Sequence, residues 1–308
     1  MAIFFFLTGL AILILGIRTI SRGLSRASGP RLRRLIRLGT KTPFLGMISG
    51  TLAAALSQSS SLITVLLVSL VNAGLLSYRQ AFGAMLGANI GTTFTIQLIA
   101  FSPEELGPPL FLLGLILSGC FPRGYFHYLG TIMLGCGSIF IGFNTMSLAF
   151  WAWRDHPDIL RWLTYMGQNQ YYGILGGALI TGILQSSSLV LSMVAAMTRL
   201  GLLDLTTAIA LCLGANVGTC VTSLLASLGT GLAARRTAFA HLLFNVWGVL
   251  LLLPILGWFT GFVARTAVDP ARQVANAHTL FNVATALLAL PLTHWFVRLV
   301  EVFIPDKK

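Results

Sequence analysis

The residues best suited to chemistry form a short polar run that occurs twice in an otherwise apolar chain. The run is Gln-Ser-Ser-Ser, at residues 58–61 and again at residues 185–188. Its amide and hydroxyl groups can donate hydrogen bonds to an oxyanion, and their oxygens can also accept the charge of a cation. We therefore expect a binding site for a small ion at these two runs. The expected substrate-binding residues are Gln58, Ser59, Ser60, Ser61, Gln185, Ser186, Ser187 and Ser188.

A second polar run, Gly-Ala-Asn-x-Gly-Thr, follows each of the first, at residues 87–92 and 214–219. Its glycines allow a helix to unwind. Its carboxamide and hydroxyl oxygens are hard ligands of the kind that suit Na⁺. We therefore expect a broken helix at this run. The expected cation ligands are Asn89, Thr92, Asn216 and Thr219.

No Asp or Glu lies in the middle of any expected span, and no Arg or Lys lies in the core of the segments that carry these runs. A proton-coupled carrier often relies on a carboxylate inside the membrane, so this absence favours Na⁺ as the coupling ion. A bound anion would have to be balanced by backbone dipoles and by cations bound with it. No Ser/His/Asp set, metal triad or nucleotide loop is recognisable, and the serines have no adjacent base, which argues against an enzyme. We expect no cofactor other than the coupling ion.

The polar runs belong to a longer repeat. Moving the chain by 127 places aligns residues 58–93 with residues 185–220 without a gap, and 15 of the 36 pairs are identical. Most of the identical residues are Gln, Ser, Asn, Gly or Thr, so shared apolar composition does not explain the match. We expect two units, residues 1–126 and 127–308. Each has a span, a Gln-Ser-Ser-Ser hairpin, a broken helix and a second span, and the second unit adds one C-terminal span.

A shorter repeat lies near the C-terminus, where the pattern His-x-x-Phe-Asn occurs at residues 241–245 and again at residues 278–282. Polar side chains of this kind inside membrane helices commonly form interhelical hydrogen bonds. We therefore expect packing roles, and no part in the site, for the histidines and asparagines of both patterns.

Composition indicates the class of fold. Of the 308 residues, 9% are charged and 56% are hydrophobic, whereas a soluble domain carries about 25% charged residues. The long apolar runs suit membrane helices of about 20 residues, and they lack the strict alternation of β-barrel strands. We therefore expect an all-α polytopic membrane protein. The net charge of +12 does not indicate nucleic-acid binding, because eight basic residues gather in one loop at residues 18–41, as in a cytoplasmic loop that faces anionic lipid.

The topology follows from segment length and charge. The apolar segment at residues 44–76 is too long for one span and too short for two, and its centre is polar, so we expect a re-entrant hairpin. Each unit then crosses three times, which makes the second unit inverted and gives seven spans. With the N-terminus outside and the C-terminus cytoplasmic, 15 of the 20 basic residues lie inside. We expect a multi-pass protein of the cell (inner) membrane, and its oligomeric state, a homo-oligomer included, stays open.

With its doubled Gln-Ser-Ser-Ser and Asn-x-Gly-Thr motifs, the chain resembles the type II sodium–phosphate cotransporter family, including its bacterial members. The resemblance covers about residues 1–300. It implies Na⁺-driven uptake of inorganic phosphate, with the tips around phosphate and Na⁺, and an elevator-like movement. Many bacterial members continue into a cytoplasmic regulatory domain, whereas this sequence stops at Lys308 without one.

We therefore expect a secondary active transporter that couples Na⁺ flow to phosphate uptake, with phosphate, Na⁺ and lipid as its partners. Three alternatives stay open. The first is a passive anion channel, or a carrier for another small oxyanion such as arsenate or sulfate. The second is a membrane-embedded enzyme, and the third is a scaffold or sensor that transports nothing. Concentrative, Na⁺-dependent uptake would separate the transporter from all three.

Overall fold

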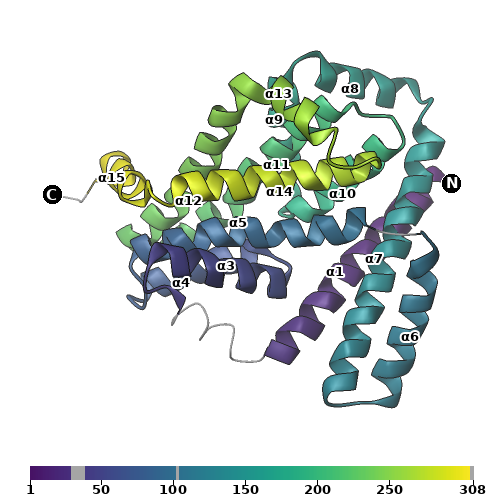
Figure 1. The fold of residues 1–308 in the computed structure, drawn as a ribbon, viewed down its shortest axis with the longest axis horizontal. Coiled ribbons are helices and arrows are strands. Elements are labelled where there is room, and N and C mark those ends of the chain that lie inside the picture. Colours follow the sequence, from purple (N-terminus) through teal and green to yellow (C-terminus); the bar gives the residue numbers. More distant parts are fainter. Residues whose placement is uncertain (29–38, 102–103, 306–308) are drawn as a thin grey trace.

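The described part of the chain folds into helices, most of them joined by short connections (Figure 1). The computed structural model describes residues 1–28, 39–101 and 104–305, and no strand occurs in this part of the chain. The first repeat contains α1 (Ala2–Ser28), α3 (Pro43–Ser57), α4 (Ser60–Asn72), α5 (Tyr78–Ala100) and α6 (Gly107–Cys120). The second contains α7 (Tyr125–Trp153), α8 (Pro157–Gln168), α9 (Gln170–Leu184), α10 (Ser187–Arg199), α11 (Leu205–Ser227), α12 (Leu232–Leu252) and α13 (Leu256–Val263). The C-terminal helices are α14 (Pro270–Ala289) and α15 (Thr293–Phe303), and short 3-10 turns occupy Glu104–Leu106 and Leu253–Ile255.

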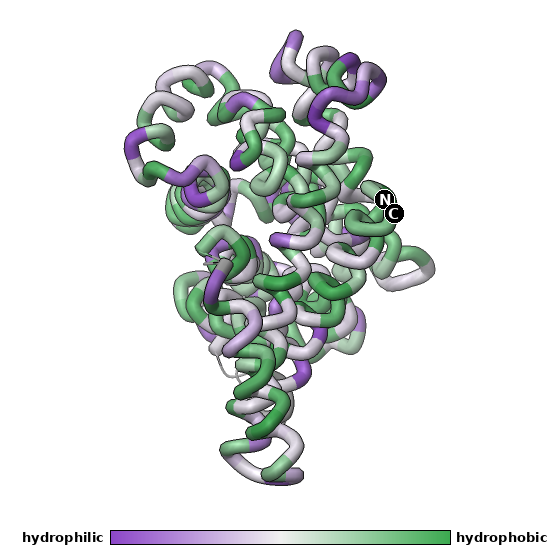
Figure 2. The backbone as a smooth tube through the Cα atoms, turned by 90° about the vertical axis from the view of Figure 1, so that its right-hand side faces the viewer, coloured by the Kyte–Doolittle hydropathy of each residue, from purple (hydrophilic) through white to green (hydrophobic). Residues whose placement is uncertain are grey.

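Several helices are suited to a membrane, which confirms the polytopic all-α class. Among the described residues, five helices are long and apolar enough to cross, and a sixth span results if α14 and α15 are counted together. Figure 2 shows apolar residues along these helices and hydrophilic stretches mainly at the connections. The expected count of seven spans is not met by length, because α6 has only 14 residues. That is about 21 Å of helix against about 30 Å of hydrocarbon, and prolines at both ends, Pro108 and Pro122, limit its extension.

The two Gln-Ser-Ser-Ser runs form the tips of helical hairpins, as expected. α3 and α9 each end at a glutamine in the left-handed conformation, with φ of 54° at Gln58 and 55° at Gln185. The next residue caps the returning helix, because the hydroxyls of Ser59 and Ser186 accept a backbone N–H three residues on, at 3.2 and 3.4 Å. The arms have 13 to 15 residues. Each arm is thus about 20–22 Å long, too short to span a bilayer.

The first arm of each hairpin packs closely on the long helix that follows. A Cβ atom at Gly87 would lie 1.9 Å from the Met47 carbonyl oxygen in α3, and one at Gly214 would lie 1.9 Å from the Ile174 carbonyl oxygen in α9. Both glycines belong to the Gly-Ala-Asn-x-Gly-Thr runs, where we expected a broken helix. Instead, α5 and α11 each continue through the run as helices of 23 residues. The expected break is wrong, because these glycines allow two backbones to approach rather than a helix to unwind.

This contact predicts a large cost for the smallest possible addition. Gly87→Ala should destabilise the protein by about 1–3 kcal/mol, because a backbone oxygen cannot move aside as a flexible side chain can. The measurement is the midpoint of thermal unfolding in detergent. Gly257→Ala in α13 is the matched control, since nothing lies within 4 Å of a Cβ there. Equal midpoints for the two variants would contradict the close contact.

The helices that begin the two repeats pack against each other in opposite directions. Gly9 of α1 contacts Met146 of α7, and Gly16, further along α1, contacts Ile139, earlier in α7. Equivalent helices of an inverted repeat must run antiparallel, and this pair does. Inversion of the whole units, with the boundary between residues 126 and 127, stays a prediction.

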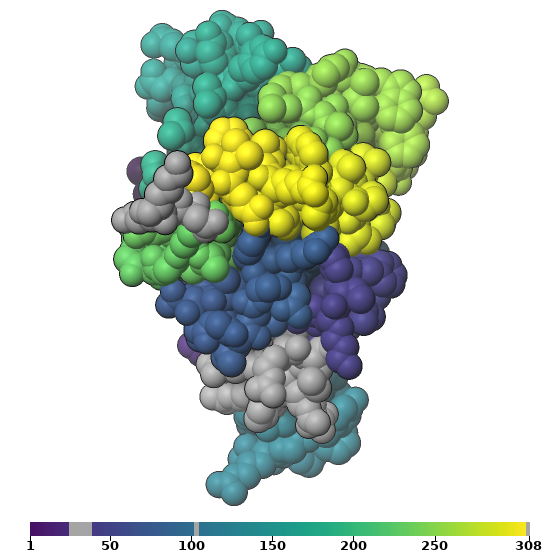
Figure 3. All heavy atoms as spheres, turned by 90° about the vertical axis from the view of Figure 1, so that its left-hand side faces the viewer, coloured from purple at the N-terminus to yellow at the C-terminus, as the bar shows by residue number. Residues whose placement is uncertain are grey.

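The two His-x-x-Phe-Asn patterns lie on α12 and α14, which pack on different hairpins. α12 contacts α4 and α5, and α14 contacts α10, α11 and α5. After α14 the chain bends by 85° into α15. Figure 3 shows this C-terminal segment against the segment that begins α5, where the Tyr78 hydroxyl donates to the Val297 carbonyl oxygen at 3.3 Å.

Candidate functional site

The two hairpin tips meet at one cavity, although they are 127 residues apart in the sequence. The cavity has a volume of about 690 Å³. It is lined by the tip residues Ser57, Gln58, Ser59, Leu184, Gln185 and Ser186, by Leu189 and Met193 of α10, and by Leu10, Ile14, Ile17, Arg18, Ser21 and Arg22 of α1. The structure therefore brings both copies of the motif to one space, with α1 as a further wall.

Four of the eight expected substrate residues line this cavity, namely the glutamine and first serine of each run. The second and third serines lie in the first turn of the returning helices and are not among the lining residues. Ser60, Ser187 and Ser188 are buried. The Ser61 hydroxyl lies 3.4 Å from the Thr222 hydroxyl, which connects the first hairpin to the second repeat.

Each tip glutamine is held by the same pair of bonds. The Gln58 side-chain oxygen accepts from the Thr95 hydroxyl at 2.8 Å, and the Gln185 oxygen accepts from Thr222 at 2.7 Å. Each side-chain amide also donates to a carbonyl three residues earlier, which is Ala55 in the first copy. The two threonines were not among the expected site residues. The sequence did contain a signal for them, because Thr95 and Thr222 are also 127 residues apart and lie just beyond the aligned block.

The tips present donors to the cavity. α4 and α10 start there, and the N-terminus of a helix carries free N–H groups and a partial positive charge. A capping hydroxyl that accepts a backbone N–H still has its own proton to donate. Ser59 and Ser186 can therefore each donate one hydrogen bond to an oxyanion in the cavity. With the glutamines bonded to protein, the serines are the freer donors.

Two arginines of α1 also reach the cavity, and the sequence analysis assigned them to topology instead. Arg18 and Arg22 were counted with the basic loop at residues 18–41, of which Arg31, Arg33, Arg34 and Arg37 lie outside the described residues. The helical spacing of Arg18, Ser21 and Arg22 places them on one face of α1. This spacing was the available signal. The residues that line the cavity include no Asp or Glu.

The first pair of expected cation ligands lies apart from the cavity lining, in a buried network between α5 and α12. The Asn89 amide donates to the Asn245 side-chain oxygen at 2.8 Å, and the Asn89 oxygen lies 3.1 Å from His241 Nε2. The Thr92 hydroxyl donates to the Asn89 backbone carbonyl at 2.8 Å. The interhelical bonds expected for His241 and Asn245 are thus present.

The second pair has a looser arrangement between α11 and α14. His278 Nε2 lies 3.2 Å from the Asn216 oxygen, as in the first copy. The bond that would match Asn89–Asn245 is missing, because the Asn216 amide nitrogen and the Asn282 oxygen are buried without partners, and so is His278 Nδ1. The Thr219 hydroxyl donates to the Ala215 carbonyl at 2.9 Å. The second copy therefore leaves polar atoms unsatisfied where the first does not.

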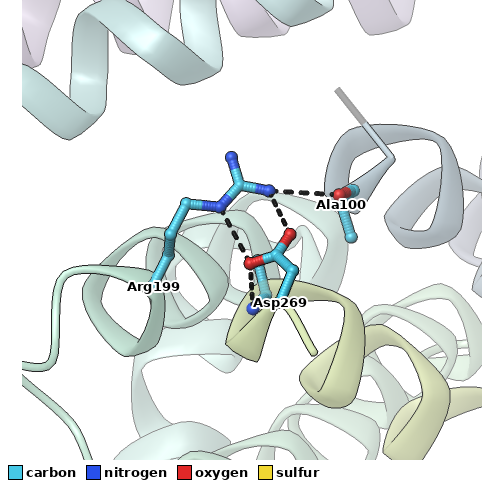
Figure 4. A network of polar contacts seen from close by, with 4 residues as sticks. Ala100, Arg199 and Asp269 are labelled. Atoms are coloured by element: carbon cyan, nitrogen blue, oxygen red, sulfur yellow. Dashed lines mark hydrogen bonds and ion pairs between the residues drawn. The ribbon is translucent and has the colours of Figure 1, made fainter. Parts of the chain in front are cut away.

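The ends of the hairpins away from the tips are tied to the N-termini of α12 and α14. Arg199, the last residue of α10, pairs with Asp269 at 3.1 and 2.6 Å and donates to the Ala100 carbonyl at 3.2 Å (Figure 4). At the equivalent position in the first copy, the Asn72 side-chain oxygen accepts the Gly231 N–H at 2.9 Å. The same connection is therefore an ion pair in one copy and a neutral hydrogen bond in the other.

Comparison with known proteins identifies relatives of the whole chain. A family model described as Na⁺/Pi-cotransporter matches residues 12–148 and 156–293. "Uncharacterized protein YqeW" of Bacillus subtilis is 35% identical over 297 residues, which are 95% of each chain. "Putative inorganic phosphate export protein YjbB" of Escherichia coli is 27% identical over 250 residues, 81% of this chain and 46% of that longer protein. Human "Sodium-dependent phosphate transport protein 2C" is 39% identical over 108 residues, 33% of this chain and 17% of its own. No solved structure matches.

Proposed function

This chain belongs to the Na⁺/Pi-cotransporter family, and we propose that it binds inorganic phosphate between its two hairpin tips and carries it across the membrane together with Na⁺. The family is one of membrane transporters, not of enzymes. The observation that best supports the proposal is the single cavity that both Gln-Ser-Ser-Ser tips line. A tetrahedral anion needs donors from several directions, and two tips on one cavity supply them.

Phosphate would accept hydrogen bonds from Ser59 and Ser186, with the N-termini of α4 and α10 adding favourable partial charge. The Thr95–Gln58 and Thr222–Gln185 bonds support this role, because they hold each tip in its left-handed turn. The serines behind the tips, at residues 60–61 and 187–188, would contribute through their backbone N–H groups at the helix starts.

Na⁺ would be held by the asparagine and threonine oxygens of the two Gly-Ala-Asn-x-Gly-Thr runs. Asn89 and Asn216 are buried within helices that contact both hairpins, so a cation there could influence the tips. Binding at Asn89 requires rearrangement of its bonds to His241 and Asn245. In the second copy the Asn216 oxygen lies 3.2 Å from His278 Nε2, and the unpartnered acceptor is the Asn282 oxygen, which favours this copy as a cation position.

We propose that phosphate is transported into the cell, driven by the inward Na⁺ gradient. The relatives differ on this point by name, because one is named for sodium-dependent transport and another for export. Uptake of labelled phosphate into proteoliposomes tests both features. We expect concentrative uptake with an inward Na⁺ gradient and little with K⁺ in its place. Uptake that is equally fast without Na⁺, or never concentrative, would instead identify a passive anion pathway.

We propose that the N-terminus lies outside and the C-terminus in the cytoplasm, in the cell (inner) membrane. The charge distribution supports this, since 15 of the 20 basic residues, Lys41 and Arg79 among them, then lie on the cytoplasmic side. Cysteine labelling at Lys41→Cys and Val268→Cys is the test. Labelling of Lys41→Cys from the cytoplasm and of Val268→Cys from outside is expected, and the reverse pattern would refute the orientation.

A further inference from the structure

One wall of the tip cavity carries positive charge that the duplicated motifs do not explain. Leu10, Ile14, Ile17, Arg18, Ser21 and Arg22 follow each other at spacings of three, four and one residues and all line the cavity. Such spacing marks one face of a helix. This face of α1 is apolar in its first half and polar in its second half, so the charge lies at one end of the cavity.

Ser21 fixes this polar half next to a tip. Its hydroxyl donates to the Ser57 carbonyl oxygen at 2.7 Å, in the last turn of α3 and one residue before Gln58. Arg18 lies one turn before Ser21 and Arg22 directly after it. This contact ties α1 to the end of α3, and the two arginines beside Ser21, both exposed, line the same cavity as Ser59 and Ser186.

The positive charge has no counterpart of opposite sign nearby. Neither arginine forms an ion pair with a carboxylate in the described part of the chain, where the ion pairs involve Arg154, Arg161 and Arg199. The sequence has no Asp or Glu before Glu104. Both arginines are exposed, and the planar donors of a guanidinium group suit the oxygens of a tetrahedral oxyanion.

The charge also breaks the symmetry of the repeat. The equivalent positions in α7, 126 residues later, hold Asn144 and Leu148. Only the first copy therefore supplies charge, while both supply serine donors. The tips alone would favour an anion only through the partial charges of their helix N-termini, whereas a wall with two full positive charges adds a stronger preference for an anion.

We propose that Arg18 and Arg22 are the charged oxyanion-binding side chains of the tip cavity and set its preference for an anionic tetrahedral ligand. The proposal rests on the tip cavity as the phosphate site. It gives a binding role to two residues that the sequence alone assigns to a basic loop, where they would contact lipid and determine membrane topology. The backbone dipoles and cations expected from the sequence would then act together with the positive charges of these two arginines.

The test is equilibrium binding of labelled phosphate to the purified full chain in detergent at saturating Na⁺. Arg18→Gln and Arg22→Gln should each weaken binding about tenfold, and the double variant about a hundredfold, the scale of a lost hydrogen bond to a charged group. Arg18→Lys and Arg22→Lys should retain more affinity than the glutamine variants, because they keep the charge. The Na⁺ concentration for half-maximal binding should change little.

Arg123→Gln is the matched control, since it removes one exposed positive charge from the α6–α7 connection, outside the cavity. Wild-type affinity in both glutamine variants, or an equal loss in Arg123→Gln, would overturn the proposal. If the glutamine variants do not fold, lysine variants that bind no better than alanine variants would also overturn it.

Binding of arsenate and sulfate is measured in parallel. If the wild type binds one of these but not phosphate, the proposed function fails while the arginine proposal is judged on that ligand. Binding of none would contradict both.

Discussion

Ser59→Ala and Ser186→Ala are each expected to weaken phosphate binding about tenfold, and together by far more than either alone. Each substitution removes one hydroxyl donor from the cavity, and a hydrogen bond to a charged group contributes roughly 1.5–3 kcal/mol, or tenfold or more in affinity. The two serines enter the cavity from different repeats, yet their effects should be of similar size. The double variant should depart from additivity, because both residues contact one ligand.

Titration calorimetry with phosphate at saturating Na⁺ measures these affinities. Ser69→Ala is the control, because it removes an exposed hydroxyl from the far part of α4, where that hydroxyl bonds only the Val65 carbonyl. Loss of the cap also costs the hairpin about 1 kcal/mol of helix stability, so thermal midpoints are needed beside the affinities. Abolished binding in one variant and unchanged binding in the other would show that a single tip holds the ligand, and that the second tip repeats its shape without its role.

The sequence was sufficient to predict the tips because their residues have few alternative uses. A glutamine followed by serines in the middle of an apolar segment needs partners within the protein, and a doubled run predicts a doubled structure. The left-handed turns at Gln58 and Gln185 and the caps at Ser59 and Ser186 agree with that prediction. Which serine of each run lines the cavity was not predictable, because this depends on the residue at which the returning helix begins.

The errors have physical causes. Glycine occurs both where a helix unwinds and where two helices pack closely. The sequence does not show which of these applies at Gly87 or Gly214. Arg18 and Arg22 are the first two residues of a dense basic run, so charge alone assigned them to topology. Only the position of α1 beside the tips shows that they also line a cavity. The seventh span is not matched by length, because α6 has only 14 residues, with prolines at both ends.

The difference between the two Asn–His networks could not be predicted either, because both copies have the same residue types. Asn89 and Asn245 bond at 2.8 Å, whereas the equivalent atoms of Asn216 and Asn282 are buried without partners. An unsatisfied buried polar group costs about 1–3 kcal/mol. The second copy therefore carries a cost that a cation, a water molecule or a small helix movement could relieve. The two asparagines should accordingly respond differently to substitution.

Asn89→Ala is expected to lower stability by about 2–6 kcal/mol, because it leaves two buried atoms, His241 Nε2 and the Asn245 side-chain oxygen, without a partner. Asn216→Ala breaks one bond, to His278, and removes an amide that already lacks a partner, so its cost should be about 1–3 kcal/mol. If Asn216 holds Na⁺, the main effect of Asn216→Ala should be on the Na⁺ dependence of uptake and not on stability. Thermal midpoints in detergent, with and without Na⁺, separate the two effects.

Asn245→Ala and Asn282→Ala form the matched pair for this comparison. Asn245→Ala removes a carboxamide that bonds Asn89, whereas Asn282→Ala removes an oxygen that has no partner. The first should therefore lower the thermal midpoint more than the second. Na⁺ should raise the midpoint of the wild type and of Asn89→Ala, and raise it less in Asn216→Ala, since a ligand stabilises only the state that binds it. Equal losses in both copies, with the same response to Na⁺, would mean that the asymmetry has no energetic consequence and that the asparagines serve only to join helices.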